Sequence, residues 1–340
     1  MCGTNGLFVG CPALSFCPLA KVDDSDCAEA DGYKSPFRQW DERAAVRTSP
    51  RRLLSDGFST LASFPEALVP ALNHAVSDGI DETDRGYLKA QQLYRYLDFT
   101  TRLEHLVVNK TALGIAHGTI RIDVPDQMRF DAYYIYVDEA YHALFSEDLA
   151  RQVRSASGII PNIAATPEFM VVLDGVMAHH PGYENLIELL FVAVSETLIT
   201  GNLVEVARSG EVDDGIADSV RDHATDEGRH HSYFRQFLRI LWGQLSPAER
   251  RVAVDVYPKL VVGFTMPERT STVLDLIAIG VSRTDAEDAG DELFSETAVR
   301  EAALRGAGRS LDYFADLQTQ DLRDVIEDQT ETVFKERTRS

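Results

Sequence analysis

Apolar residues recur at intervals of three and four along most of this chain, from residue 36 onward. That period is typical of amphipathic α-helices, and no convincing run of alternating strand residues interrupts it. The expected fold is therefore all-α. The pattern predicts long helices over 82–116, 124–155, 182–209 and 213–244, and shorter ones near 65–77, 167–179, 247–264, 268–281, 284–305 and 308–328.

Boundary signals agree with these spans. The segment that begins at Ser246 combines a capping box with proline at the first helical position, and Gly118 and Gly158 end the first two long helices. Nothing between the helices has the composition of a linker, so residues 36–330 are expected to form a single domain. Residues 1–35 hold all four cysteines without periodicity and are interpreted as a flexible leader, and residues 331–340 as a charged tail.

The long helices carry one arrangement of ionisable residues twice. The pattern Glu…Glu-x-x-His occurs as Glu104, Glu139 and His142, and again as Glu196, Glu227 and His230. The distance from the lone glutamate to its motif is that of one helix, a loop and one helix back. Four helices arranged in this way direct four carboxylates and two imidazoles at one interior point. Donors in this ratio suit a pair of iron or manganese ions.

These residues interrupt faces that are otherwise apolar. Glu196 lies in LIELLFVAVSETLI, and the face that carries Glu227 and His230 continues into Phe234 and Phe237. Burying such groups without partners costs several kcal/mol each, and metal coordination removes that cost. His223 lies four residues before Glu227, hence on the same face and one turn away. We therefore expect it to be a third nitrogen ligand.

An aspartate precedes the glutamate of each Glu-x-x-His motif. Asp138 and Asp226 are predicted to accept the free ring N–H of a ligand histidine across the bundle, which fixes the tautomer of that histidine. The second copy reads D-E-x-R-H and includes Arg229, a form that resembles di-iron monooxygenases. These three residues are expected to surround the ligands.

Four segments, TRLEHL, YVDEAYHALF, VAVSETLI and DHATDEGRHHSYF, carry a wider resemblance. Over about residues 60–245 the chain resembles the p-aminobenzoate N-oxygenase family. The resemblance implies a ferritin-like four-helix bundle with additional peripheral helices, seven protein ligands on two iron ions, and a homodimer. It also implies that O2 is used to oxidise an aryl amine to hydroxylamine, nitroso and nitro products in the biosynthesis of natural products such as antibiotics.

The ligand chemistry favours oxygen activation independently of this resemblance. Four carboxylates balance the charge of two Fe(II) ions, so that a reduced centre is tolerable in a dry core. The di-iron centre itself is the expected catalytic group, and the sequence assigns no substrate-binding residue. We expect one iron to be held mainly by Glu104, Glu139 and His142, and the other iron or a bridge to involve Glu196, His223, Glu227 and His230.

Two alternatives stay open beside N-oxidation. A di-iron C-hydroxylase or desaturase would use the same metals, and a ferritin-like iron protein that is not an oxygenase would share the fold. A storage ferritin has a much shorter chain. A ribonucleotide reductase small subunit would carry tyrosine soon after the first Glu-x-x-His, where this chain has Ala143 to Ser146. Both observations disfavour the second alternative.

Charge and composition limit the partners. The 54 acidic and 33 basic residues give a formal net charge of -21, which argues against nucleic acid and anionic membranes as partners. The N-terminus lacks the features of a secretory signal, and no apolar run reaches the ~18 residues of a membrane span. We expect a cytoplasmic enzyme whose partners are a small amine and an electron donor, either a reductase or a ferredoxin-like carrier.

Overall fold

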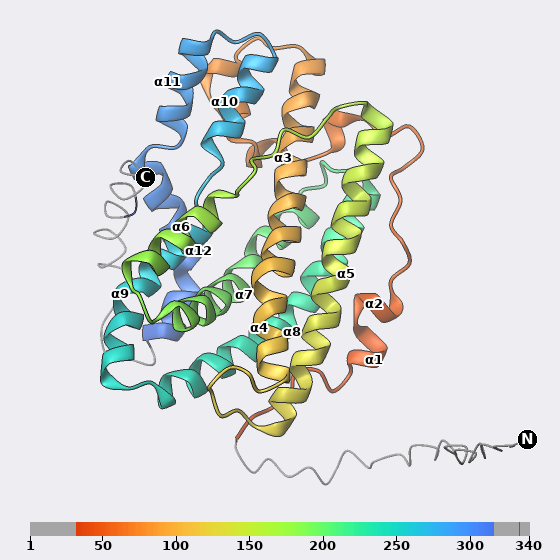
Figure 1. The fold of residues 1–340 in the computed structure, drawn as a ribbon. Helices are drawn as coiled ribbons and strands as arrows, with labels where there is room; N and C mark the ends of the chain where they lie inside the picture. The colour runs from red at the N-terminus through yellow and green to blue at the C-terminus, as the bar shows by residue number, and fades with distance from the viewer. Residues whose placement is uncertain (1–31, 316–332, 334–340) are drawn as a thin grey trace, which may run out of the picture. The chain divides into compact units, whose positions relative to one another are not determined.

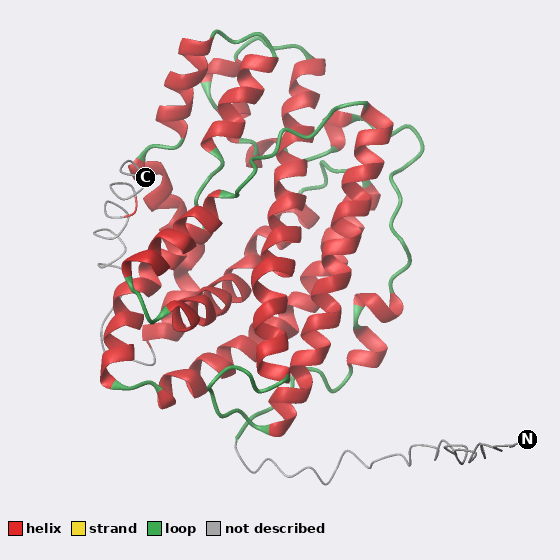
Figure 2. Ribbon diagram, in the orientation of Figure 1, coloured by secondary structure: helices red, strands yellow, loops and turns green. Residues whose placement is uncertain are grey.

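The computed structural model describes residues 32–315 and residue 333. The chain divides into two compact units, Met1–Lys34 and Ser35–Ser340, and the description below concerns the second. Nearly all of the predicted leader and tail lies outside the described residues. Helices are present throughout the described residues, and no strand is assigned among them (Figure 2). This confirms the all-α prediction.

Four rods form a bundle (Figure 1). The second rod packs against the first and the fourth, and the third packs against the fourth and the first, so that all four enclose one core. This confirms the predicted ferritin-like bundle. The rods are α3 (Glu82–Leu103) continued by η5 (Glu104–Val108) and α4 (Asn109–Ala116), then α5 (Asp126–Ser157), α7 (Glu184–Arg208) and α8 (Asp214–Gln244).

Shorter helices surround the bundle. On the side of α7 they are α6 (Glu168–His179), α9 (Pro247–Phe264) and α12 (Glu296–Ala315), whereas α10 (Arg269–Ala278) and α11 (Arg283–Leu293) pack together near α3 (Figure 1). Because α6, α9 and α12 all pack on α7, that helix has little free surface. Among the described helices it is the one long and apolar enough to cross a membrane, and 86% of the apolar window is buried inside the protein. Burial on all sides accounts for its composition.

Three of the predicted shorter helices differ from the structure. Residues 65–77 form three separate 3-10 turns, because Pro70 lacks the N–H that would continue the first turn and the backbone is extended at His74. The predicted helices 284–305 and 308–328 divide at a different place, and residues 316–328 lie outside the described part of the chain. The chain breaks at Phe294 and Ser295, and α12 then runs without interruption through Gly306 and Gly308. Contacts of α12 with α7 and α9 outweigh the low helix propensity of those glycines.

An N-terminal strap, defined here as residues 40–58, crosses two of the rods. It begins with the short helices α1 (Trp40–Arg43) and α2 (Ala45–Thr48), which pack on α5 and α8. Arg52 pairs with Asp222 of α8 at 2.8 Å. Gln152 of α5 accepts a hydrogen bond from the backbone of Leu54 and donates one to the carbonyl of Arg52. The sequence pattern did not predict this strap.

The strap approaches α8 most closely at Gly215. A Cβ atom at this position would lie 2.1 Å from the carbonyl oxygen of Leu53, which is far inside contact distance. Asp213 caps the same helix end by accepting from the N–H of Gly215 at 2.9 Å. Glycine is therefore required where the backbone of the strap meets the start of α8.

Gly215→Ala should lower the free energy of unfolding by about 1–3 kcal/mol, because the strap must move away from α8. The control is Gly243→Ala in the same helix, where a Cβ meets nothing within 4 Å. That variant should be neutral or more stable by up to ~1 kcal/mol. Urea denaturation followed by circular dichroism measures both, and equal stabilities would contradict the assigned contact.

Candidate metal centre

All four rods contribute ionisable side chains to one buried point in the bundle. Glu104 comes from η5, Glu196 from α7, and the remaining residues from α5 and α8. The seven residues predicted as ligands are all at most 2% exposed, namely Glu104, Glu139, His142, Glu196, His223, Glu227 and His230. The structure therefore brings together the complete set that the sequence singled out.

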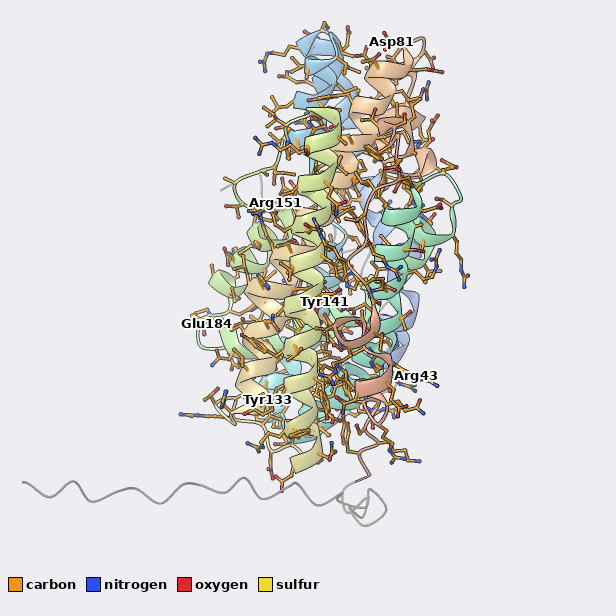
Figure 3. All side chains as sticks on the ribbon, turned by 90° about the vertical axis from the view of Figure 1, so that its right-hand side faces the viewer. Arg43, Asp81, Tyr133, Tyr141, Arg151 and Glu184 are labelled. Carbon is orange, nitrogen blue, oxygen red and sulfur yellow. The ribbon has the colours of Figure 1, made fainter. Side chains whose placement is uncertain are left out.

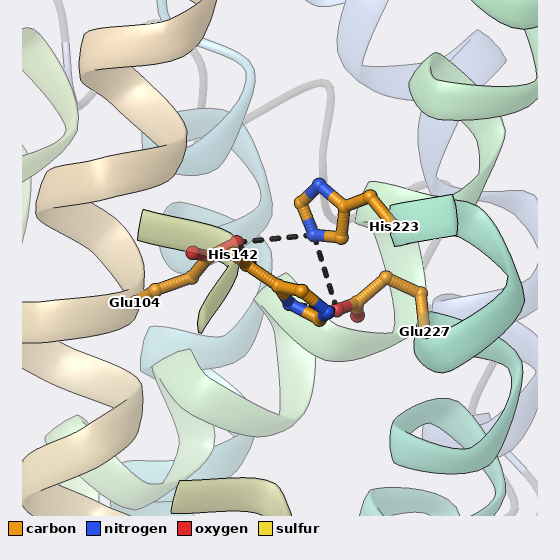
Figure 4. Close-up of side chains that lie close together, drawn as sticks. All are labelled: Glu104, His142, His223 and Glu227. Atoms are coloured by element: carbon orange, nitrogen blue, oxygen red, sulfur yellow. Dashed lines mark ion pairs between the residues drawn. The ribbon is translucent and has the colours of Figure 1, made fainter. Parts of the chain in front are cut away.

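The seven side chains form two groups that share one member. Within each group, one donor atom from every residue lies within 4.8 Å of the others, as a bound metal ion would require. Glu227 belongs to both groups. The groups are Glu104, His142, His223 and Glu227 (Figure 4), and Glu139, Glu196, Glu227 and His230.

Glu139 faces both groups. It belongs to the group of Glu196, Glu227 and His230, and its Oε2 also lies 3.2 Å from Nδ1 of His142 in the other group. The expected place of Glu139 beside Glu104 and His142 on one iron therefore stays a prediction. His223 joins the same group as Glu104, with Nε2 at 3.0 Å from Oε1 of Glu104 and 3.2 Å from Oε1 of Glu227.

The helix that carries Glu104 is locally widened. The predicted helix 82–116 has the expected ends, but residues Glu104–Val108 form a π-helical turn rather than an α-helical one. A π-turn adds one residue to the helical repeat and so shifts the side chains around the axis. Such turns are frequent at functional sites, and this one begins at the residue that faces the cluster. No residue type in the sequence signalled it.

Two aspartates orient the histidines from across the bundle. Nε2 of His142 on α5 lies 3.0 Å from Oδ2 of Asp226 on α8, and Nε2 of His230 on α8 lies 3.2 Å from Oδ2 of Asp138 on α5. In each pair the imidazole Nε2–H donates to the aspartate oxygen. Each Nδ1 then faces the glutamates, where its lone pair could bind a metal ion once its own proton is displaced. These are the contacts that the sequence predicted, while ligation itself stays a prediction.

The aspartates are held in turn by residues outside the Glu-x-x-His motifs. The indole N–H of Trp40 donates to Oδ1 of Asp138 at 2.8 Å, and the backbone N–H of Ala45 donates to the carboxylate of Asp226 at 3.2 Å. Arg229 pairs with Asp226 and also lies 3.8 Å from Asp138. The N-terminal strap therefore completes the surroundings of the site. Sequence analysis missed Trp40 and Ala45, because their segment has neither a motif nor a helical period long enough to interpret.

Comparison with known proteins gives a matching result. The model of the p-aminobenzoate N-oxygenase AurF family matches residues 48–301, which include all seven buried residues. The chain belongs to this family. It is also 24% identical over 263 residues to a 4-aminobenzoate N-oxygenase from Streptomyces thioluteus, across 75% of this chain and 77% of that protein. The family match extends beyond residues 60–245 in both directions, so the resemblance seen in the sequence was drawn too narrowly.

As a member of this family, the chain is an oxygenase of the arylamine N-oxygenase type. Its buried cluster can be tested for whether it suits metal ions. Three carboxylate oxygens are buried without a hydrogen-bond partner, namely Oε2 of Glu104, of Glu196 and of Glu227. Leaving such atoms unsatisfied costs about 1–3 kcal/mol or more each. Four carboxylates and three imidazoles around these oxygens fit a pair of divalent cations of the first transition row.

The pKa shifts of the buried groups also indicate that the cluster lacks positive charge. Burial, together with repulsion from Glu139 and Glu227, raises the pKa of Glu104 well above its usual value. Burial opposes the charged form of His142, but its hydrogen bonds to Asp226 and Glu139 outweigh this and raise its pKa to about 10. Protons thus neutralise the cluster when no cation does, and metal binding would displace them.

One further polar group near the cluster was not singled out from the sequence. The hydroxyl of Tyr96 on α3 is buried without a hydrogen-bond partner. Burial and the charges of Glu104 and Glu227 raise the pKa of Tyr96, so the phenol stays protonated and keeps a free O–H donor. A tyrosine within a helical core pattern carries no signal in the sequence, which is why only the structure identifies it.

Trp40→Phe should weaken binding of a divalent metal about tenfold, because Asp138 loses the donor that orients it toward His230. In the wild type the ring of Trp40 stacks on Tyr134 with 4.5 Å between the ring centroids, and a phenyl ring should preserve this stacking. Isothermal titration of metal-free protein with Mn(II) measures the affinity. The control is Trp242→Phe near the end of α8. Unchanged affinity in the Trp40 variant would show that the hydrogen bond does not support the site.

Proposed function

We propose that the chain holds two iron ions in the buried cluster and uses O2 to oxidise the amino group of an aryl amine of the aminobenzoate class. The single observation that carries this proposal is the sharing of Glu227 between two groups of buried donors in an N-oxygenase family member. The substrate class is suggested by the relative named 4-aminobenzoate N-oxygenase.

Each iron would have its own ligands beside the shared carboxylate. Glu104, His142 and His223 would hold one ion, and Glu139, Glu196 and His230 the other, with Glu227 common to both. In His142 and His230 the Nδ1 atom would bind the metal, since Nε2 donates to an aspartate. A carboxylate acceptor makes the ring a stronger electron donor and prevents its rotation.

When bound, the two irons supply the electrons and the open coordination positions through which O2 is activated. Four carboxylates balance the charge of two Fe(II), and the apolar walls around them exclude water. The first oxidation would consume one aryl amine, one O2, two electrons and two protons, and yield one hydroxylamine and one water. Further oxidation would give the nitroso and nitro products. Because the two irons would have to be reduced again after supplying these two electrons, we propose an external reductase or ferredoxin-like donor.

The competing functions have less support. A C-hydroxylase or desaturase would use the same donor set, but both comparisons favour N-oxidation. A non-oxygenase iron protein is disfavoured for the same reason. We further propose that the enzyme acts as a homodimer in the cytoplasm, in the biosynthesis of a nitro-containing natural product such as an antibiotic. The net charge of -21 supports the absence of a nucleic acid or membrane partner.

Removing the shared carboxylate should affect both ions. Glu227→Ala should bind less than one iron per chain, because each group of donors loses a member. Glu104→Ala is the matched variant, since Glu104 belongs to one group, and it should keep close to one iron. Iron is measured by a colorimetric assay after anaerobic loading, with circular dichroism to confirm folding. Two irons retained by Glu227→Ala would contradict the assignment.

The reaction is tested directly with a panel of amines. Iron-loaded, reduced protein mixed with O2 should convert 4-aminobenzoate or a related aryl amine to its hydroxylamine, which is heavier than the amine by one oxygen atom. The nitroso and nitro compounds that follow should be identified by their own molecular masses. Mass spectrometry with 18O2 should place the label on nitrogen. Benzoate is the control, because it has no amino nitrogen and an N-oxygenase should leave it unchanged. Label on ring carbon instead would favour the C-hydroxylase.

A further inference from the structure

A hydrogen-bonded path leads from the buried cluster to the N-terminal strap. Nε2 of His230 donates to Oδ2 of Asp138 at 3.2 Å, and Oδ1 of the same carboxylate accepts from the indole N–H of Trp40 at 2.8 Å. His230 and Asp138 are fully buried, whereas Trp40 is 8% exposed and lies at the edge of the core. The path therefore joins a predicted metal ligand to an aromatic ring next to the protein surface.

The other aspartate has no aromatic partner on its outer side. Asp226 accepts from His142, and it is held from the other direction by the backbone N–H of Ala45 and by Arg229. Electron tunnelling slows steeply with distance, and it is faster through bonds and hydrogen bonds than across gaps between atoms. Among the groups that hold the two aspartates, the indole of Trp40 is therefore the one best suited to pass an electron inward.

Arginines lie beside Trp40 at the protein surface. Arg38, Arg43 and Arg47 are all exposed, and we call these three residues the arginine patch. The guanidinium carbon of Arg47 lies over the ring of Trp40, 5.8 Å from its centroid. Figure 3 looks onto this side of the bundle, with the strap beside α5 and Arg43 labelled on the strap. The outer end of the path thus lies within a positively charged surface.

This local charge is opposite to that of the chain as a whole. Residues 35–52 contain five arginines and two acidic residues, while the formal net charge of the chain is -21. An acidic protein is repelled by a surface of that net charge and attracted to the arginine patch, so electrostatic steering brings it to Trp40. A basic protein would be drawn to other parts of the surface. The sign of the charge therefore selects an acidic partner.

We propose that an acidic one-electron carrier of the ferredoxin class docks on the arginine patch and passes electrons through Trp40, Asp138 and His230 to the metal centre. This inference rests on the proposed function, in which the irons are reduced from outside. Each transfer oxidises one iron–sulfur cluster of the carrier and reduces one iron(III) ion. The indole and the imidazole keep their protons, so no bond forms or breaks. A carrier held by a few exposed charges also dissociates readily, as repeated delivery of single electrons requires.

The first experiment measures how fast a reduced, acidic plant-type [2Fe–2S] ferredoxin reduces the oxidised, iron-loaded protein in a stopped-flow instrument. The absorbance of the ferredoxin reports its oxidation, and no amine is needed. Arg43→Glu combined with Arg47→Glu should lower the second-order rate constant at least ~10-fold at low ionic strength, and added salt should slow the wild type.

The control for charge is Arg283→Glu combined with Arg305→Glu. These arginine side chains are 71% and 70% exposed and lie on α11 and α12, so the control changes the net charge equally at a distance from Trp40. Its rate constant should stay close to that of the wild type. Equal rate constants in the two double variants, or a wild-type rate that does not depend on salt, would overturn the proposal.

Trp40→Phe tests the path itself. At saturating ferredoxin the rate of electron transfer should fall about tenfold, because a phenyl ring has no N–H to continue the path to Asp138. Reduced methyl viologen, a small dye that approaches from any side, should reduce this variant as fast as the wild type, and the midpoint potential should be unchanged. Trp242→Phe is the control. A purely structural role of Trp40 would slow both reductants equally or shift the potential, and either result would overturn the proposal.

Iron content and amine conversion by chemically reduced protein are measured on the same preparations, which separates this inference from the proposed function. Protein that binds no iron would overturn both. Protein that binds two irons and accepts electrons as described, but converts no amine, would overturn the proposed substrate and support the electron path. Protein that converts amine but is reduced by ferredoxin equally well without the arginine patch would overturn the docking proposal alone.

Discussion

The structure depends on burying four carboxylates and three imidazoles in the centre of an apolar bundle. Charges removed from water are strongly destabilising unless they are paired or bound to metal. Oε2 of Glu104, of Glu196 and of Glu227 has no hydrogen-bond partner, and burial raises the pKa of Glu104 and of Glu196 well above the usual value. The cluster is therefore a site that protein groups alone leave incomplete. Two divalent ions would supply the missing charge.

The rest of the fold keeps these side chains in place. Asp138 on α5 accepts a hydrogen bond from His230 on α8, and Asp226 on α8 accepts one from His142 on α5. Each of these helices therefore orients a histidine of the other. Trp40 and the backbone of Ala45 then tie both aspartates to the N-terminal strap. Contacts between residues far apart in sequence thus fix the orientation of the imidazole rings of His142 and His230. Such fixed rings would hold metal ions in one geometry inside a site that excludes water, as oxygenase chemistry requires.

Helix α5 contributes more groups to the buried centre than the sequence motif alone names. Its inner face supplies Glu139, His142 and Asp138, and all three are fully buried. The region that matches the N-oxygenase family includes this helix and every residue of the buried cluster.

The sequence by itself determined the helical fold, the ends of all four rods to within two residues, and the seven residues that meet in the core, because helical period and Glu-x-x-His spacing are local properties of the chain. It did not determine that Glu227 lies in both groups or that Glu139 contacts His142 as well as His230, since these contacts depend on how whole rods are rotated. The π-turn at Glu104 and the indole of Trp40 on Asp138 also appeared only in the structure. Each of these depends on contacts between residues distant in sequence, and tertiary packing alone decides such contacts.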